Sequence, residues 1–431
     1  MSSPKFRAAL PLPLAVGALV TCLVAPAATE ALARPPAQRP QAAAQSFHDA
    51  VAEAWARLPQ RRDFASQRGA AGARYAAAGG LFPSAPYAVG TYFNDKVLGS
   101  NYNYLTAQAE LGTPIWLPGE ATATQATAQA DGAAVTAAIE AAHLALAAQV
   151  LDLATQATLA ANARDAMARR LATAQSLAGD LAHRFQAGES SQSDALAASS
   201  DAATAAAALS SAEAQLASAR AALAVVVGND LLPRLDAPRL IASGPASLPR
   251  PKAEALAAHP RVVAAERAVA AAQASARLVQ IENRDSPEIG LQGINEKQPG
   301  ARWDTRFGFT FWLPFATEAR NAPRRAAAEL SVTQSMVQLS LAQREVLAGV
   351  RQAEAALGGA ERSSGAFERA AAELEKRRGQ IERAWRMGEM PLIEVVRANA
   401  LAFDAEYNRD RARSELGAAR LRLRLAEGIL P

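Results

Sequence analysis

The side chains that most often carry catalysis or bind metals are scattered through this sequence. The four histidines, His48, His143, His183 and His259, lie far apart, and none belongs to an HExxH pattern or a carboxylate-rich cluster. The single cysteine, Cys22, lies in an apolar N-terminal stretch. The sequence has no P-loop, GxSxG motif or dinucleotide fingerprint. These observations predict a protein that is not an enzyme and that holds no metal or cofactor.

One short motif occurs twice, in RFQAGESSQSDAL from Arg184 and in AWRMGEMPLIEVV from Ala384. Gly188 and Gly388 lie 200 residues apart, and a glutamate follows each of them. Glycine commonly ends a helix because it adopts the left-handed backbone conformation at little cost. We therefore expect each motif to be a tight turn between two helices.

The residues after each glycine can begin the next helix. Ser190 is a good N-cap residue, and Pro391 suits the first helical turn. Asp194 and Glu394 then fall in the first turn, where the helix dipole favours a carboxylate. Solvated first-turn carboxylates are a sufficient explanation of these two residues.

The helices around the two turns are long and similarly placed. The first half predicts a helix near Ser46, a long helix over 120–187 and a further helix over 190–227 that stops at Gly228. The second half predicts a helix after Pro251, a long helix over 318–387 and a helix over 391–427. A helix of about 68 residues is about 100 Å long. The expected organisation is a first repeat over 46–228, a linker over 229–251 and a second repeat over 252–431.

Each half also contains a region with the two-residue period of a β-hairpin, about 86–116 and about 287–313. In the second hairpin, Phe307, Phe309 and Phe311 alternate with polar or small residues. The regions end in Trp-Leu-Pro, at Trp116 and at Trp312. Strands of about 10 residues with one apolar face and terminal aromatic residues are typical of outer-membrane β-barrels. Glu110, Asp304 and Arg306 would then face a pore.

The N-terminus has the pattern of an export signal. Lys5 and Arg7 precede an apolar segment over 10–24, and Ala31-Leu32-Ala33 is a suitable cleavage site. We expect a signal peptide over 1–33 and a flexible leader over 34–45. Removal of the signal would remove Cys22, whose lipidation is an alternative. No later segment offers about 20 consecutive apolar residues, so we expect no membrane-spanning helix.

Composition agrees with an elongated helical protein. Hydrophobic residues make up 50% of the sequence but aromatic residues only 5%, because alanine dominates. The net charge of +4 is small and the basic residues are dispersed, which does not favour nucleic-acid binding. Four strands cannot stand alone in a bilayer, because an open sheet edge leaves backbone groups unpaired there. Several chains must share the barrel, and three copies would supply twelve strands.

The order and spacing of these features resemble the TolC-like outer-membrane efflux proteins over about 47–429. The resemblance rests on the duplicated order, the Trp-Leu-Pro strand exits, the two glycine turns, and Gly228 and Gly428 at the helix ends. It implies a mainly α fold with a shared trimeric twelve-stranded β-barrel, continued by a periplasmic α-helical barrel. LPFATEARNAPRRAAAE over 313–329 is similar to the subgroup of cobalt–zinc–cadmium resistance–nodulation–division pumps.

The resemblance also implies partners and sites. The chain would be an outer-membrane homotrimer that contacts lipid, a periplasmic adaptor protein and an inner-membrane efflux pump, and exports heavy-metal cations. Asp194 and Glu394 would form an entrance gate with Arg184 or Arg386 as ionic partners. The strand-end positions of Trp116 and Trp312 by themselves predict that both lie at the membrane interface. The residues expected to contact the adaptor are Arg184, Phe185, Gly188, Glu189, Ser190, Arg386, Gly388 and Glu389.

Three alternatives remain open at this stage. Within the same family the chain could serve drug efflux or type I protein secretion. In a different class it could be an exported coiled-coil structural protein. The alternating strands and their aromatic exits favour a channel over such a scaffold.

Overall fold

The computed structural model describes residues 45–95, 99, 103–235 and 256–430. The expected signal peptide, Cys22, nearly all of the leader and most of the linker lie outside these residues. Within them the elements follow the chain in this order: α1 (Phe47–Arg57), α2 (Gln60–Ala77), β1 (Tyr87–Asn94), β2 (Leu105–Pro114), α3 (Glu120–Gln186), α4 (Gln192–Val227), α6 (Pro260–Ile281), β3 (Glu288–Lys297), β4 (Asp304–Trp312), α7 (Glu318–Arg386) and α8 (Leu392–Ala426). The prediction of a mainly helical fold with a smaller antiparallel sheet is confirmed.

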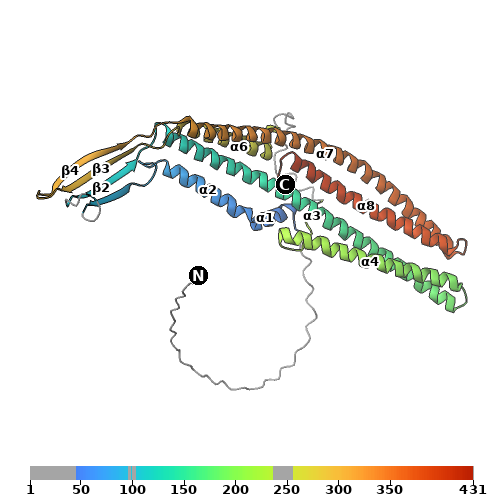
Figure 1. Ribbon diagram of the computed structural model, residues 1–431. Coiled ribbons are helices and arrows are strands. Elements are labelled where there is room, and N and C mark those ends of the chain that lie inside the picture. The colour runs from blue at the N-terminus through green and yellow to red at the C-terminus, as the bar shows by residue number, and fades with distance from the viewer. Residues whose placement is uncertain (1–44, 96–98, 100–102, 236–255, 431) are drawn as a thin grey trace, which may run out of the picture. The chain divides into compact units, whose positions relative to one another are not determined.

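The helices form one layer in which neighbours pack side by side. On the half next to the sheet, α2 packs on α3, α3 on α6 and α6 on α7; on the other half, α4 packs on α3, α3 on α8 and α8 on α7. The long helices α3 and α7 therefore run through both halves. Figure 1 shows the strands at one end of this layer and the α3–α4 and α7–α8 turns at the other.

Alanine explains why such long helices pack closely. Most of the buried residues of α3 are alanines, including Ala147, Ala154 and Ala157, which are fully covered. Alanine has the highest helix propensity and its small side chain lets neighbouring backbones approach. One 18-residue window of α3 has a mean hydropathy of 1.5, so α3 is apolar and long enough to cross a membrane by that criterion. The expectation of no membrane-spanning helix rested on the lack of about 20 consecutive apolar residues, and it stays a prediction.

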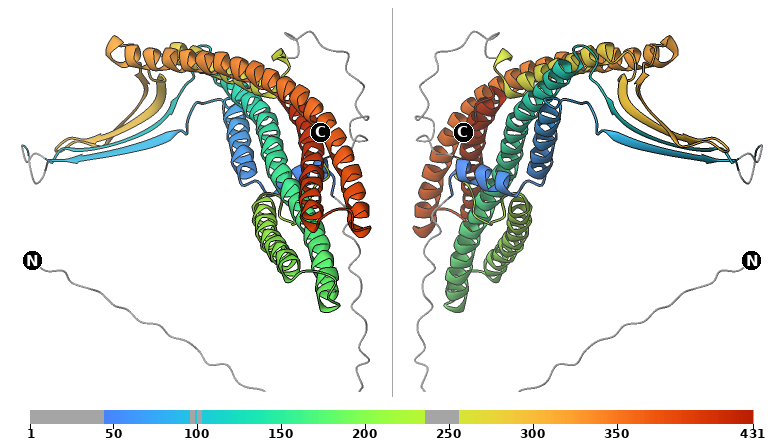
Figure 2. Two further views of the ribbon diagram at one scale, coloured as in Figure 1. Left: turned by 90° about the vertical axis from the view of Figure 1, so that its right-hand side faces the viewer. Right: turned by 90° about the vertical axis from the view of Figure 1, so that its left-hand side faces the viewer.

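The sheet is antiparallel, in the order β1-β2-β3-β4. Its two hairpins are joined through β2 and β3, where Leu111 pairs with Leu291. Figure 2 shows the strands extending away from the helix ends. The edges of the sheet within this chain are β1 and β4, which have no strand partner on their outer sides among the described residues.

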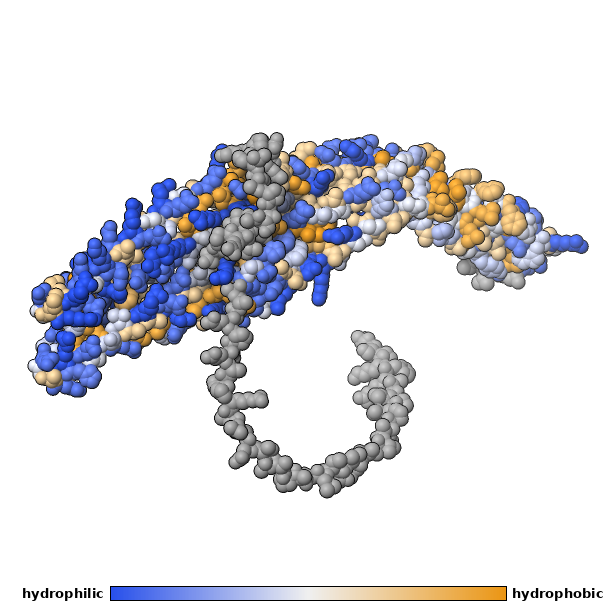
Figure 3. Space-filling view, turned by 180° about the vertical axis from the view of Figure 1, so that it is seen from behind, coloured by the Kyte–Doolittle hydropathy of each residue, from blue (hydrophilic) through white to orange (hydrophobic). Residues whose placement is uncertain are grey.

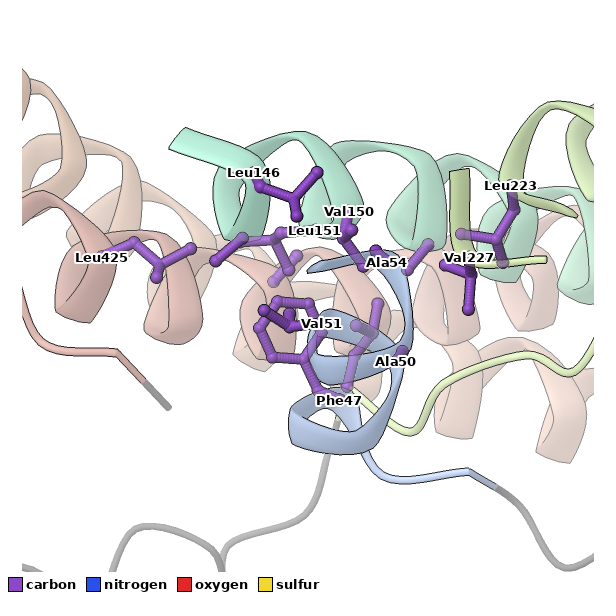
Figure 4. Close-up of a cluster of buried hydrophobic side chains, with 14 of the residues drawn as sticks. Phe47, Ala50, Val51, Ala54, Leu146, Val150, Leu151, Leu223, Val227 and Leu425 are labelled. Carbon is purple, nitrogen blue, oxygen red and sulfur yellow. The ribbon is translucent and has the colours of Figure 1, made fainter. Parts of the chain in front are cut away.

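The largest hydrophobic core lies where α1 crosses the helical layer. Phe47, Val51 and Ala54 of α1 pack against Val150 and Leu151 of α3. Figure 4 shows the α1 side chains directed at those of α3, with Val227 at one side and Leu425 at the other. This core thus joins both halves of the chain.

Sequence reasoning missed α2. It expected one helix before the first hairpin, whereas α1 ends at Arg57, Leu58 has an extended backbone and α2 begins after Pro59. Proline lacks the N–H that a continuous helix needs, so the chain restarts there. Residues 251–255, where the second half's counterpart of α1 was expected to begin, lie outside the described residues, and α6 begins at Pro260.

Candidate functional site: the sheet faces and the two hairpin turns

One face of the sheet is apolar. Strand register places Ala88, Leu111, Leu291 and Phe309 in one row across the sheet. Phe307, Phe309 and Phe311 alternate along β4 on this face and are 79%, 80% and 76% exposed. In Figure 3 hydrophobic residues gather over the strand end of the molecule, while the opposite helical end is mainly hydrophilic. Side chains this large and this exposed need an apolar partner outside the chain.

The opposite face, called the polar face, carries most of the charged residues of the strands, and Val89 and Phe93 of β1 also lie on it. Strand register places Thr91, Gln108, Ile294 and Arg306 in one row. Arg306, which was expected to face a pore, therefore lies on the side of the sheet opposite the apolar face. Arg306 forms ion pairs with Glu296 and Asp304 on this face. Alternation along β2 puts Glu110 on the same face. The structure therefore places the three residues expected to face a pore on the same face of the sheet.

A side-chain contact on the polar face joins the two hairpins. The Tyr87 hydroxyl of β1 donates a hydrogen bond to Glu288 Oε2 of β3, at 2.6 Å. The tyrosine ring crosses β2 at Gly112, where an added Cβ would lie 2.4 Å from the ring. Gly112 thus leaves the space that the ring needs. Sequence reasoning missed this contact because its two ends come from different repeats.

The two Trp-Leu-Pro tryptophans differ in their surroundings. Trp312 pairs with Glu288 and, by alternation, shares the polar face with Thr310. It therefore does not continue the Phe307–Phe311 face. Trp116 lies beyond the end of β2, and its indole N–H donates a hydrogen bond to the Gly80 carbonyl, at 3.0 Å. This bond fastens the strand exit to the segment after α2.

The turns that join α3 to α4 and α7 to α8, called the two hairpin turns from here on, have the same backbone geometry. At the first turn the Glu189 N–H bonds to the Arg184 carbonyl and the Gly188 N–H to the Phe185 carbonyl, at 2.8 and 3.0 Å. At the second turn the Glu389 and Gly388 N–H groups make the equivalent bonds, both at 2.9 Å. These paired bonds define a Schellman motif, which ends a helix at a left-handed residue.

Both turn glycines have the backbone conformation that the motif demands. Gly188 has φ of +76° and Gly388 has φ of +79°. A Cβ built on either residue would meet no atom within 4 Å. The requirement for glycine therefore comes from the backbone angle and not from crowding inside the chain.

The start of α4 differs by one residue from the prediction. Its N-cap is Ser191 and not Ser190, since the Ser191 hydroxyl accepts a hydrogen bond from the Asp194 N–H at 3.1 Å. The same hydroxyl donates to the Asp194 carboxylate at 2.8 Å. Asp194 is thus part of a helix cap. Ser190 instead donates to the Leu181 carbonyl, at 3.3 Å.

The expected ionic partners of the first-turn acids have other contacts within this chain. Glu394 pairs with Arg397 at 2.8 Å, and Arg386 pairs with Glu382 one turn earlier in α7. The Arg184 guanidinium carbon lies 4.7 Å from the centre of the Trp385 ring. Among the described residues of a single chain, therefore, neither Asp194 nor Glu394 forms an ion pair with Arg184 or Arg386.

The Arg184–Trp385 contact brings the two turns together. Beneath it, Leu181, Ala198 and Leu392 form a small hydrophobic cluster on which Trp385 packs. Near the turns, Phe185, Met387 and Ile393 are exposed. Sequence reasoning named Phe185 but missed Trp385, Met387 and Ile393. The alignment of Trp385 with Phe185 in the repeat was the signal that could have pointed to Trp385.

The described residues contain no group of three or more His, Cys, Asp or Glu side chains that could hold a metal ion. His143 stacks on Trp55 of α1, with ring centres 4.6 Å apart. Burial lowers the pKa of His143, and nearby His48 lowers it further. His143 is therefore a packing residue of the α1–α3 contact.

Comparison of the fold with solved structures gives clear matches. CusC, studied for transmembrane channel formation, has a TM-score of 0.70 at 17% identity, with 92% of this chain and 99% of that chain covered. The outer membrane protein VceC of Vibrio cholerae has a TM-score of 0.65 at 17% identity, covering 89% and 96%. The MtrE outer membrane channel of Neisseria gonorrhoeae, in its open state, has a TM-score of 0.67 at 18% identity, covering 89% of each chain.

Comparison of the sequence with family models and with curated proteins gives no match. The structural matches extend over nearly the whole length of each chain. On this evidence the chain has the fold of the TolC-like outer-membrane channels.

Proposed function

We propose that this protein is the outer-membrane channel of a tripartite efflux pump. The observation that carries the proposal is that one chain has two unlike open edges. β4 and α7 form one edge, and β1, α2 and α4 form the other. Two unlike edges allow identical copies to join head to tail, and such contacts form a ring when the rotation from copy to copy closes.

The exposed sheet face supports a membrane location for one end of this ring. The Phe307, Phe309 and Phe311 side chains would contact lipid, and the Arg306 face would line water. An open sheet edge in hydrocarbon leaves N–H and C=O groups unpaired at a cost of several kcal/mol each, so closure is required there. Three copies would supply twelve strands, and the helical layer would continue the tube into the periplasm.

Two adjacent residues of β3 test which face meets lipid. Leu291 lies on the apolar face and Gln292 on the polar face. A lysine on the lipid face of a barrel costs about 2–4 kcal/mol near the bilayer centre. We expect L291K to lower the amount of heat-stable oligomer in outer-membrane fractions and Q292K to leave it near the wild-type level. Equal effects of both variants would contradict the assignment of the faces.

We propose that the two hairpin turns contact the periplasmic adaptor. The supporting observations are the exposed Phe185 and Met387 side chains and the open space around Gly188 and Gly388. Arg184, Glu189, Ser190, Arg386 and Glu389 surround these positions. The contact would couple the channel to an inner-membrane pump.

Bulky substitutions separate docking from assembly. The G188W/G388W variant should still form the membrane oligomer but should lose efflux and adaptor cross-linking. G188N/G388N is the matched control, because asparagine tolerates the left-handed conformation and has a smaller side chain. Normal efflux by G188W/G388W would refute docking through the turns.

We propose that Asp194 and Glu394 lie near a closed entrance and contribute to gating between copies. Their positions beside the turns support this role, whereas Ser191 and Arg397 satisfy them within one chain. A D194K/E394K variant should change single-channel conductance in planar bilayers. Unchanged conductance in a variant that assembles normally would exclude a gating role.

The cargo that we propose is heavy-metal cations, supported only by the segment over 313–329. The proposal also includes an N-terminal export signal and contact with outer-membrane lipid. Trp116 and Trp312 keep a predicted interface role, although Trp312 lies on the polar face of β4. A deletion strain tested against zinc, cobalt, cadmium, copper and a drug panel would decide the cargo. Drug sensitivity with normal metal tolerance would replace metal export by drug efflux.

A further inference from the structure

The end of α8 meets the start of α6 at a tightly packed joint. Gly428 ends α8 with φ of +79°. A Cβ added to Gly428 would lie 2.7 Å from Pro260 Cδ and 2.9 Å from His259 Cδ2. The histidine ring therefore lies directly against the last residues of α8.

His259 is also the N-cap of α6. Its Nδ1 accepts a hydrogen bond from the Arg261 N–H, at 3.2 Å. The residue is only 3% exposed. A ring nitrogen can accept a hydrogen bond only in the neutral imidazole, since both nitrogens are donors in the protonated form. The cap therefore requires a neutral His259.

The surroundings of His259 disfavour its protonation. Burial lowers the pKa of His259, and the positive charge of Arg261 lowers it further. Glu345 of α7 faces Arg261 at 3.9 Å, and Glu427 precedes Gly428 at the end of α8. A proton on the ring would add a positive charge beside Arg261 and beside the positive end of the α6 dipole.

The first repeat has a corresponding joint in which an arginine takes the place of the histidine. Gly228 ends α4 with φ of +91°, and an added Cβ would lie 1.7 Å from Arg57 Nη1. An arginine stays protonated at every pH of interest. Acid can therefore act on the α8–α6 joint and not on the α4–α1 joint in this way.

We propose that His259 is an acid-sensitive latch at the joint between α8 and α6. Protonation removes the N-cap bond, places a charge in the buried joint and loosens the end of α8. Because α8 begins at the second hairpin turn, the loosening acts on the helix that carries that turn. Arg57 at the corresponding joint of the first repeat does not titrate, so the latch itself acts on the second repeat alone.

Hydrogen exchange of the full-length protein at pH 7.5 and 5.0, corrected for intrinsic rates, tests the latch. In the wild type we expect acid to speed exchange about fivefold in peptides over 259–266 and 420–429, as expected for loss of one cap. H259N keeps an N-cap acceptor that does not titrate, and it should abolish the acid effect. Peptides over 222–229, which lie away from His259, should show the same acid response in both proteins.

A second variant, H259S, has a different side chain that also caps the helix without titrating, so it controls for a packing defect specific to H259N. Exchange in α3 that matches the wild type at the same pH establishes that each variant is folded. The proposal is overturned if acid speeds exchange at the joint equally in the wild type and in both variants. It is also overturned if acid has no effect at the joint in the wild type. Neither result depends on whether the protein conducts or exports anything.

Discussion

The guanidinium of Arg184 lies over the ring of Trp385, 4.7 Å from its centre. Arg184 lies in the last turn of α3 in the first repeat, and Trp385 lies in the last turn of α7 in the second. The contact therefore joins the two hairpin turns of one chain.

Removing this contact should loosen both turns. An exposed cation–π contact contributes about 0.5–1 kcal/mol. In R184A we expect amide exchange at Glu189 and Glu389 to rise about two- to fivefold, as that free energy implies. The comparison variant is R386A, which loses a pair with Glu382 within α7 and should affect the second turn alone. Faster exchange of only the first turn in R184A would show that the contact does not couple the turns.

The left-handed glycines should respond to the backbone angle of the new residue. An alanine in the left-handed conformation costs about 1–2 kcal/mol, whereas asparagine adopts it more readily. We therefore expect G188A and G388A to increase fraying at the adjoining helix ends, as measured by amide exchange, and G188N and G388N to do so less. Because no atom lies within 4 Å of an added Cβ, crowding cannot produce this order. Equal effects of alanine and asparagine would contradict the explanation.

Stability should decrease in acid through His143. Its pKa is lowered from the ordinary value of 6.5, so the folded protein favours the neutral ring. The contribution of His143 is fully present above about pH 6.5, its unfolded pKa, and is lost as the pH falls towards the folded pKa. We expect H143Q to reduce the difference in thermal midpoint between pH 7.5 and pH 5.5. An unchanged difference would show that His143 does not cause it.

The repeated elements could be predicted because local pattern determines them. The helices over 120–187 and 318–387 and the strands of both hairpins lie within a few residues of their expected positions. The spacing of hydrophobic residues and the residue types of a turn are local properties of the sequence, and they were sufficient to place these elements.

Contacts between repeats could not be predicted in the same way. The Tyr87–Glu288 bond and the Arg184–Trp385 contact each join residues about 200 positions apart, and local periodicity carries no information on such pairs. Within one chain the two acids bond to Ser191 and Arg397, which lie close to them in sequence, and the predicted entrance pairs stay a prediction. Short-range partners of this kind compete with distant ones at little entropic cost.

Disulfide cross-linking between the β1 and β4 edges tests the central claim, that copies of this chain close head to tail, most directly. In a Cys22→Ser background, Thr91→Cys in β1 is combined with single cysteines at successive positions of β4 from Thr305 to Phe311. We predict that some combinations give a covalent ring of three chains in outer-membrane fractions, and that each single-cysteine chain gives none. If every combination leaves monomers, or if β1 cross-links to β1, the edges do not join head to tail and the channel is contradicted.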